Sequence, residues 1–262
     1  MTRHRLNLDD EFSYPVYRTF RGSPRSEMHY LISGEDKSGN AVDVPRVPIS
    51  IAQAIGRQQI NFPEEVTLFW REVGFHTGDG VIYGQDGDVL IVLDAPPLRE
   101  LTSKSELYHG ALVLPDESWE ELKMQKEKVL HLTKQEVSET EGRGYIKSSS
   151  GWIPANSKVE KVWDFLSRGN DNLKYHPELV SAQCDGAEKV MMFYFDRGRC
   201  VWTPTVLRPW IMGKMNNRMT LRPGEFNHES ALMVGVALEL ALPRVIEYVK
   251  KARGEVTFSL EE

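Results

Sequence analysis

Two apolar runs joined by a polar turn decide the fold of this chain: Val81-Ile-Tyr83, Gly84-Gln-Asp-Gly-Asp88 and Val89-Leu-Ile-Val-Leu93. The Asp86-Gly87 pair between the runs is typical of a β-hairpin, here with a loop longer than two residues. Residues 90–93 are continuously apolar instead of alternating with polar residues. Strands of that kind are covered on both faces. The stretch therefore predicts a hairpin whose second strand is buried from both sides.

Three helices are predicted on the two sides of this hairpin. Ser50-Ile-Ala-Gln53 has capping-box spacing and starts a short helix at Ile51 that Gly56 ends. Pro63 opens a second helix that Gly74 closes, and a second capping box, Ser157-Lys-Val-Glu160, opens a third. The apolar stripes of the last two helices, spaced i, i+3, i+4 and i+7, are Val66, Phe69, Trp70 and Val73, and Val159, Val162, Trp163 and Leu166.

Shorter patterns predict four further elements. Residues 28–33 (Met-His-Tyr-Leu-Ile-Ser) are typical of a strand. Asp116 caps a helix with Trp119, Leu122, Val129 and Leu130 inward. Residues 190–195 and 200–206 predict a second hairpin, with Pro204 confining the later strand to an edge. Asn227 caps a last helix from Ala231, broken at Pro243 and resumed to Lys251.

These elements mix helices and short antiparallel hairpins without a βαβ rhythm, so the predicted fold class is α+β, in two lobes. Residues 1–26 are polar and basic and predict an irregular arm. Residues 27–133 form the first lobe. The polar, Gly- and Ser-containing segment 134–156 is the predicted linker loop, and residues 157–262 form a second lobe with the C-terminal helix.

Composition excludes several classes of protein. The chain has 262 residues, 40% of them hydrophobic, and a formal net charge of −6, which together exclude a disordered chain. Two cysteines cannot make a disulfide scaffold or a four-thiolate zinc site. The longest apolar run, residues 231–242, is too short to span a bilayer, and the N-terminus lacks the apolar core of a signal peptide. We therefore expect a cytoplasmic globular protein.

The charge is unevenly distributed. Residues 1–131 hold 14 Lys and Arg against 21 Asp and Glu, a net −7, whereas residues 132–262 hold 18 against 17, a net +1. The span from Arg197 to Arg222 has six basic residues and no acidic one, with Trp202 and Trp210 between them. In a nucleic-acid-binding protein, the cations of such a span would bind phosphates and its aromatic rings would stack on the nucleobases. Alternatively, the tryptophans are core residues and the arginines pair with acidic residues of the first half.

The predicted helix at residues 63–75, Pro-Glu-Glu-Val-Thr-Leu-Phe-Trp-Arg-Glu-Val-Gly-Phe, resembles the start of the SUKH superfamily domain. In that family a short helix precedes the proline, as residues 51–56 would here, and the next strands would be residues 81–83 and 89–93. The domain is known largely from bacterial immunity proteins that bind a cognate toxin, and it has no catalytic residues. The resemblance implies binding through an acidic surface, for which Asp79, Asp86 and Asp88 are the candidates.

A second resemblance points to an enzyme. Leu107-Tyr-His-Gly110 resembles the first motif of ADP-ribosyltransferases of the His-Tyr-Glu type, and Gly142-Arg-Gly-Tyr145 resembles their later tyrosine segment. The resemblance implies that His109 orients NAD, that Tyr145 stacks on nicotinamide, and that Glu229 or Glu225 polarises the ribose. The sequence departs from the family in the position of the tyrosine and at Ala111, where the family has a hydroxyl residue.

The leading prediction is a non-catalytic protein that binds a protein partner. The more specific form of this prediction is an immunity or inhibitor protein that neutralises a toxin or effector. Its candidate partner-binding residues are Asp79, Asp86, Asp88, Arg197, Arg199, Arg208 and Lys214. No catalytic residue, cofactor or metal site is predicted, because the seven histidines are dispersed and no nucleotide or metal motif occurs. An NAD-dependent ADP-ribosyltransferase and a nucleic-acid-binding module at Arg197–Arg222 are the alternatives. The sequence predicts no membrane partner and indicates no oligomeric state.

Overall fold

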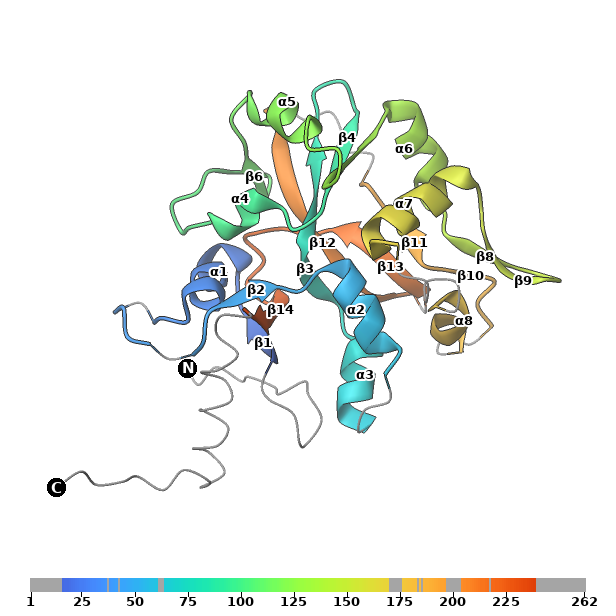
Figure 1. Ribbon diagram of the computed structural model, residues 1–262, viewed down its shortest axis with the longest axis horizontal. Coiled ribbons are helices and arrows are strands. Elements are labelled where there is room, and N and C mark those ends of the chain that lie inside the picture. The colour runs from blue at the N-terminus through green and yellow to red at the C-terminus, as the bar shows by residue number, and fades with distance from the viewer. Residues whose placement is uncertain are drawn as a thin grey trace.

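The computed structural model describes residues 16–36, 38–41, 43–60, 64–169, 176–182, 184, 186–196, 204–216 and 218–238. Helices and two β-sheets form this part of the chain, which confirms the predicted α+β class (Figure 1). The larger sheet has eleven strands: β1 (Tyr17–Arg21), β2 (Arg46–Pro48), β3 (Phe75–Tyr83), β4 (Val89–Val92), β5 (Leu107–Tyr108), β6 (Ala111–Val113), β7 (Val129–Leu132), β11 (Met192–Phe193), β12 (Val206–Met215), β13 (Arg218–Pro223) and β14 (Leu232–Ala237). The smaller sheet has β8 (Tyr145–Ser148), β9 (Gly151–Pro154) and β10 (Lys189–Val190).

Strand β3 lies at the centre of the larger sheet, and all nine of its residues are buried. It pairs antiparallel with β4 and β12, and in parallel with β14 at Met233↔His76. The register with β4 runs from Gly80↔Val92 to Tyr83↔Val89, which confirms the predicted first hairpin. Strand β14 in turn pairs with β1 and β2, so both early and late segments of the chain are joined to β3.

Eight helices lie around the sheets in the described ranges: α1 (Pro24–Ser33), α2 (Ile51–Gln58), α3 (Glu64–Glu72), α4 (Pro96–Arg99), α5 (Ser118–Lys123), α6 (Lys134–Thr140), α7 (Ser157–Ser167) and α8 (His176–Ser181). Val89 and Ile91 of β4 belong to one apolar cluster with residues of α2, α3 and α7. Leu90 and Val92 belong to another with residues of α1, α4 and α5. Successive residues of a strand point to opposite faces, so β4 is covered on both, as predicted.

Local capping chemistry places the predicted helices. The Ser50 hydroxyl accepts from the backbone N–H of Gln53, and the Gln53 side chain accepts from that of Ser50, so the capping box of α2 is confirmed. Helix α3 buries Val66, Phe69 and Trp70 as its stripe predicts. Helix α7 also forms, but Asn156 caps it: its Oδ1 accepts from the backbone N–H groups of Lys158 and Val159.

Two predicted elements have the wrong secondary structure. Residues 28–33 are helical, because Pro24 starts α1, Met28 and Leu31 are buried one turn apart, and Gly34 ends the helix in the left-handed conformation. Residues 232–237 form strand β14 instead of a helix, and all of them are buried. An apolar run of this length fits a strand covered on both faces as well as a buried helix. Residues 239–251 of the predicted last helix lie outside the described residues.

Two further pairings differ from prediction. Strand β11 pairs in parallel with β13, and β12 forms its antiparallel hairpin with β13, so residues 190–195 and 200–206 are not hairpin partners. Residues 200–203 themselves lie outside the described residues. The helix after Asp116 ends at Lys123, and Val129 and Leu130 belong to strand β7, which pairs with β4.

Segments predicted as irregular contain regular elements. The arm at residues 1–26 includes β1 and the start of α1, while residues 1–15 lie outside the described residues. The linker at residues 134–156 contains α6, β8 and β9; Thr133 and Glu136 form a capping box that starts α6. Strands from before and after this segment belong to one eleven-stranded sheet. That sheet therefore extends across the predicted boundary between the two lobes. No helix in the described ranges has the length and apolar character needed to cross a bilayer.

His176, the first residue of α8, is fully buried, and neither ring nitrogen has a hydrogen-bond partner among the described residues. Burial lowers the pKa of His176 from its ordinary value of 6.5 to about 3. Between these two pH values the unfolded chain binds a proton here that the folded chain does not. The contribution of His176 to stability therefore falls as the pH falls below 6.5.

We expect His176→Leu to raise the free energy of unfolding by about 1–2 kcal/mol at pH 7, because it removes an unsatisfied buried polar group. The gain should be larger at pH 5, where the wild-type chain also bears the cost of keeping His176 neutral. Urea unfolding at both pH values measures the difference, with exposed His29→Leu as the control. A variant that is less stable than wild type at both pH values would contradict this account.

Candidate functional site

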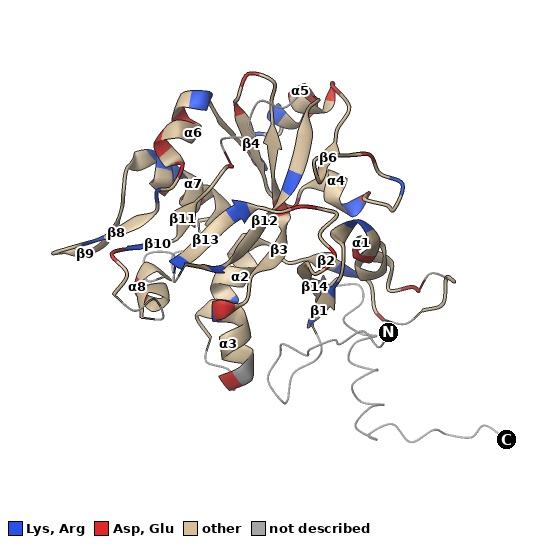
Figure 2. Cartoon of the chain, turned by 180° about the vertical axis from the view of Figure 1, so that it is seen from behind, with Lys and Arg blue, Asp and Glu red and all other residues tan. Residues whose placement is uncertain are grey.

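The turn between β3 and β4 and the start of α5 enclose a hollow of about 320 Å³, here called the acidic pocket. Its charged and aromatic lining residues are Asp86, Asp88, Asp116, Trp119, Glu120 and Lys123. Four carboxylates against one ammonium group give this lining a formal charge of −3. Figure 2 shows acidic positions beside β4 and around α5 at one end of the molecule. The structure thus brings together two of the three acidic residues that the sequence singled out.

Asp86 and Asp88 have different roles in this pocket. Asp86 is exposed at the tip of the turn. Asp88 is half-buried: its Oδ2 lies 2.8 Å from Nε2 of His131, and its Oδ1 accepts from the backbone N–H of Lys134 at 2.8 Å. Asp88 therefore fixes the turn against β7 and the start of α6, and Asp86 is the one of the pair that is open to a partner.

Trp119 forms the aromatic wall of the acidic pocket, and sequence analysis had assigned it to the core. The edge of its ring lies on Gly84, where an added Cβ would stand 2.7 Å from Cη2 of the indole. Its ring is also edge-on to His131, with centroids 6.3 Å apart. Trp119 stays partly exposed between these contacts. A glycine immediately after an apolar strand run was the sequence signal for this close approach.

Asp79 was expected on a surface turn, and the structure corrects this: it lies in β3 and is 0% exposed. Its Oδ2 accepts from the backbone N–H of Ile51 at 2.6 Å, and its Oδ1 accepts from that of Asp94 at 2.9 Å. Arg168 lies 3.6 Å from the same carboxylate. Desolvation by burial nevertheless raises the pKa of Asp79 from its ordinary value of 3.8 to about 6. Asp79 therefore ties elements together inside the fold and is not part of a binding surface.

The candidate basic residues do not form one surface in the described chain. Arg208 is 2% exposed and donates from Nη2 to the carbonyl oxygen of His109 at 2.9 Å. Lys214 lies 3.3 Å from the Glu72 carboxylate. Trp210 is fully buried, while Arg197, Arg199 and Trp202 lie outside the described residues.

The residues of the transferase resemblance lie in different parts of the fold. His109 is exposed in the turn between β5 and β6, with a φ of +47°. Tyr145 is buried in β8 of the smaller sheet, and burial raises its pKa to about 12. Figure 1 shows β6 and β8 on opposite sides of the molecule. Glu229 is exposed, and Glu225 lies beside Arg208, with Oε1 3.9 Å from Nη1.

A second hollow, of about 350 Å³, lies at the start of β3 and is here called the His76 cavity. Strands β3 and β12, the end of β13 and the loop at residues 223–231 enclose it. Its lining includes His76, Ile211, Arg222, Glu225, His228 and Leu232. Sequence analysis missed this site, because its residues come from distant segments and share no motif. No group of three or more His, Cys, Asp or Glu side chains in the described ranges is arranged to hold a metal ion.

Comparisons with known proteins identify no family. No family model and no curated protein matches the chain. A solved structure described as "Accommodation of massive sequence variation in Nanoarchaeota by the C-type lectin fold" is 12% identical to this chain. The similarity covers 72% of this chain and 87% of that one, with a TM-score of 0.45. A likeness at this level carries no argument about activity, and membership of the SUKH family stays a prediction.

We expect Asp79→Ala to lower the free energy of unfolding by about 2–4 kcal/mol, because one buried and one partly buried backbone N–H group lose their acceptor. Asp79→Asn keeps one acceptor and should cost less. Between pH 6 and 3.8 the folded state binds the Asp79 proton and the unfolded state does not, so this group adds stability as the pH falls.

That pH-dependent gain should therefore be present in the wild type and absent in Asp79→Asn. Urea unfolding at pH 7.5 and pH 5 measures both effects, with exposed Asp164→Ala on α7 as the control. Equal losses for Asp79→Ala and Asp164→Ala would contradict the assigned role.

Proposed function

We propose that this protein is a non-catalytic binding protein whose acidic pocket receives a basic segment of a partner protein. The observation that supports this most directly is the hollow itself, where Asp86, Asp116 and Glu120 are exposed beside the ring of Trp119. Carboxylates recognise the cationic heads of Lys and Arg, and an indole ring attracts the same cations through its π-face. A single Lys or Arg side chain can therefore use both features at once.

The surrounding charge favours the same partner. Residues 1–131, which supply nearly all of the acidic pocket, carry a net charge of −7. A field of one sign raises the rate at which an oppositely charged protein meets the surface, and it repels partners of like charge. This effect weakens as salt shortens the range of the field.

The immunity-type role implied by the SUKH resemblance is the more specific form of this proposal. The basic segment would then belong to a toxin or effector, and binding at the acidic pocket would block that protein's own contact with its target. The cytoplasmic location expected from the sequence is part of the same proposal. The acidic residues that serve it are Asp86, Asp116 and Glu120, with Asp88 as the residue that positions the turn.

The other two functions receive less support from the described residues. Of the four described basic residues in the span Arg197–Arg222, Arg208 is buried and Lys214 pairs with Glu72, so only Arg218 and Arg222 are exposed for a nucleic acid. An NAD site would need His109, Tyr145 and a glutamate in one cleft, but β6, which follows His109, and β8, which contains Tyr145, lie on opposite sides of the molecule (Figure 1).

Isothermal titration calorimetry with a hexa-arginine peptide tests the proposal, with hexa-glutamate as the probe of opposite charge. The pocket variant Asp86→Asn/Asp116→Asn/Glu120→Gln removes three exposed carboxylates. We expect it to weaken hexa-arginine binding about tenfold, because exposed ion pairs contribute about 0.2–1 kcal/mol each. Trp119→Leu should weaken binding by a further two- to fivefold, from about 0.5–1 kcal/mol of cation–π energy.

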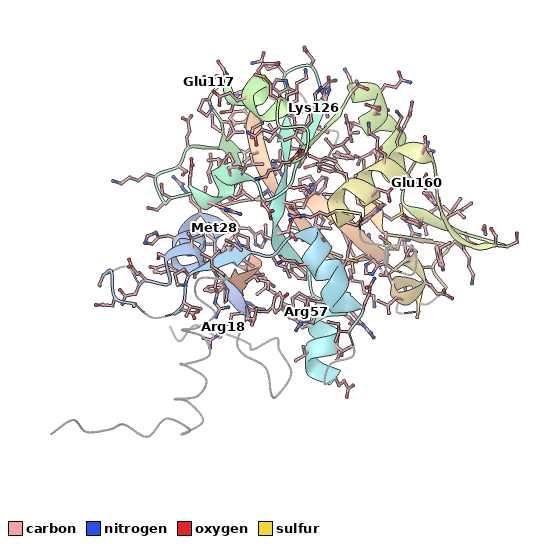
Figure 3. All side chains as sticks on the ribbon, viewed as in Figure 1. Arg18, Met28, Arg57, Glu117, Lys126 and Glu160 are labelled. Atoms are coloured by element: carbon pink, nitrogen blue, oxygen red, sulfur yellow. The ribbon has the colours of Figure 1, made fainter. Side chains whose placement is uncertain are left out.

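A charge-matched control separates the pocket from bulk charge. Glu160→Gln/Asp164→Asn/Glu188→Gln removes three exposed carboxylates elsewhere; Figure 3 labels Glu160 on α7, well away from Glu117 at the start of α5. This control should change hexa-arginine affinity less than twofold at 150 mM salt. Equal losses for the control and the pocket variant, or equal binding of hexa-glutamate, would overturn the proposal.

A further inference from the structure

Strand β7 ends one branch of the eleven-stranded sheet, and its outer side is here called the β7 edge. Within the described chain, β7 pairs with β4 alone, in a continuous register from Val89↔Leu132 to Val92↔Val129. The strand contains neither proline nor glycine, and its register has no bulge. The unpaired N–H and C=O groups of such an edge can pair with a strand of another chain.

The hydrogen-bond pattern fixes which backbone groups point outward from β7. Along an antiparallel pair, residues that bond to the partner strand alternate with residues that do not. The backbone N–H of Leu93 donates to the carbonyl oxygen of Lys128 at 2.9 Å, so in this register Leu130 also bonds to β4. The N–H and C=O groups of Val129 and His131 therefore point away from β4. In the described part of the chain these four groups have no hydrogen-bond partner.

The side chains of the same two residues lie on the face of the sheet that adjoins the acidic pocket. Val129 belongs to one apolar cluster with a residue of α5. The ring of His131 is edge-on to Trp119, and its Nε2 lies 2.8 Å from Oδ2 of Asp88. Trp119 and Asp88 both line the acidic pocket. Residues directly opposite each other in a sheet place their side chains on one face, so a residue paired with His131 points toward this pocket.

The opposite face of β7 has a different character. Leu130 is partly buried there, against an apolar cluster that includes Val137 of α6. Lys128 is exposed, and it lies on the same face as Leu130 because the two are two residues apart. An apolar side chain suits this face, whereas a basic one would meet the charge of Lys128. An added strand would thus place every second residue toward carboxylates and the residues between them toward Leu130.

These two faces favour a basic partner over a second copy of this chain. If two copies paired antiparallel through their β7 edges, both acidic pockets would lie on the same face of the joined sheet. The carboxylates of the two pockets would then repel each other. A strand with basic residues at alternate positions carries the complementary charge instead.

We propose, as a more specific form of the function proposed above and resting on it, that the β7 edge binds an extended segment of the partner in which basic and apolar residues alternate. The backbone of the segment pairs with the outward N–H and C=O groups of Val129 and His131 and adds a strand to the sheet. Its basic side chains lie toward the acidic pocket, and its apolar ones lie beside Leu130. Strand pairing then contributes affinity that does not depend on side chains, and the alternation contributes specificity.

Calorimetry on the full chain with the acetylated, amidated hexapeptide Arg-Val-Arg-Val-Arg-Val tests this pairing. Two control peptides carry three backbone N-methyl groups each, either on the arginines or on the valines. In the proposed complex the arginine N–H groups face β7 and the valine N–H groups face away. We expect methylation of the arginines to weaken binding about tenfold or more, because two N–H donors to β7 are lost. Methylation of the valines should change the affinity less than about twofold.

Amide hydrogen exchange locates the added strand on the protein. The backbone N–H groups of Val129 and His131 should exchange more slowly when the hexapeptide is added, whereas that of Leu130 is already protected by β4. His131→Pro removes one outward N–H and no bond to β4, and proline is tolerated at such edge positions. His131→Ala is the matched control, because both variants lose the imidazole. We expect the hexapeptide to bind His131→Pro about threefold or more weakly than His131→Ala. Thermal unfolding shows whether each variant is folded.

Equal affinities of the two methylated peptides, unchanged exchange at Val129 and His131, or absence of hexapeptide binding would overturn the strand pairing. The proposed function has its own test in hexa-arginine. If the Asp86→Asn/Asp116→Asn/Glu120→Gln variant weakens hexa-arginine binding while the two methylated peptides bind equally, the strand pairing fails and the proposed function stands. Protection of Val129 and His131 that increases with protein concentration in the absence of peptide would show a second copy at the β7 edge and would also overturn the proposal.

Discussion

The carboxylate of Asp79 is the constraint on which the arrangement of this fold depends. From the central strand β3, it accepts hydrogen bonds from Ile51 at the start of α2 and from Asp94 after β4. Arg168, which follows α7, lies against the same carboxylate and binds Asp94 at 2.7 Å. Asp94 and Arg168 both have positive φ, at 45° and 57°. Such conformations are costly for residues other than glycine, and this ion pair helps to hold both.

The same strand also explains why the acidic pocket and the His76 cavity are separate from each other. Because β3 is buried along its whole length, neither of its faces can be a binding surface. Its two ends meet turns and loops that come from different parts of the chain, and each end adjoins one of the hollows. The turn to β4 meets α5 to form the acidic pocket, and the first residues of β3 meet the loop before β14 to form the His76 cavity.

Local signals in the sequence predicted the elements whose start or turn depends on adjacent residues. The Ser50–Gln53 capping box and the Asp86-Gly87 turn are examples, since all of their partners lie within a few residues. Strand β14 and the burial of Asp79 could not be predicted in this way. The partners of Asp79 are 28 and 15 residues away, and His76 meets Leu232 across 156 residues. Such contacts depend on the topology of the sheet, which no single stretch of this sequence encodes.

Charge counting along the sequence found an acidic first half, but it misjudged which charges are available. The basic span at Arg197–Arg222 suggested an exposed cationic surface, yet burial and pairing remove two of its cations: Arg208 lies inside the fold and Lys214 pairs with Glu72. Asp79 does not contribute to the acidic surface, because it too is buried and paired inside the fold. A charged side chain can bind a partner protein only if it is not already buried and paired inside the fold. By that criterion, Asp86, Asp116 and Glu120 remain for an external cation, and Arg222 remains for an external anion.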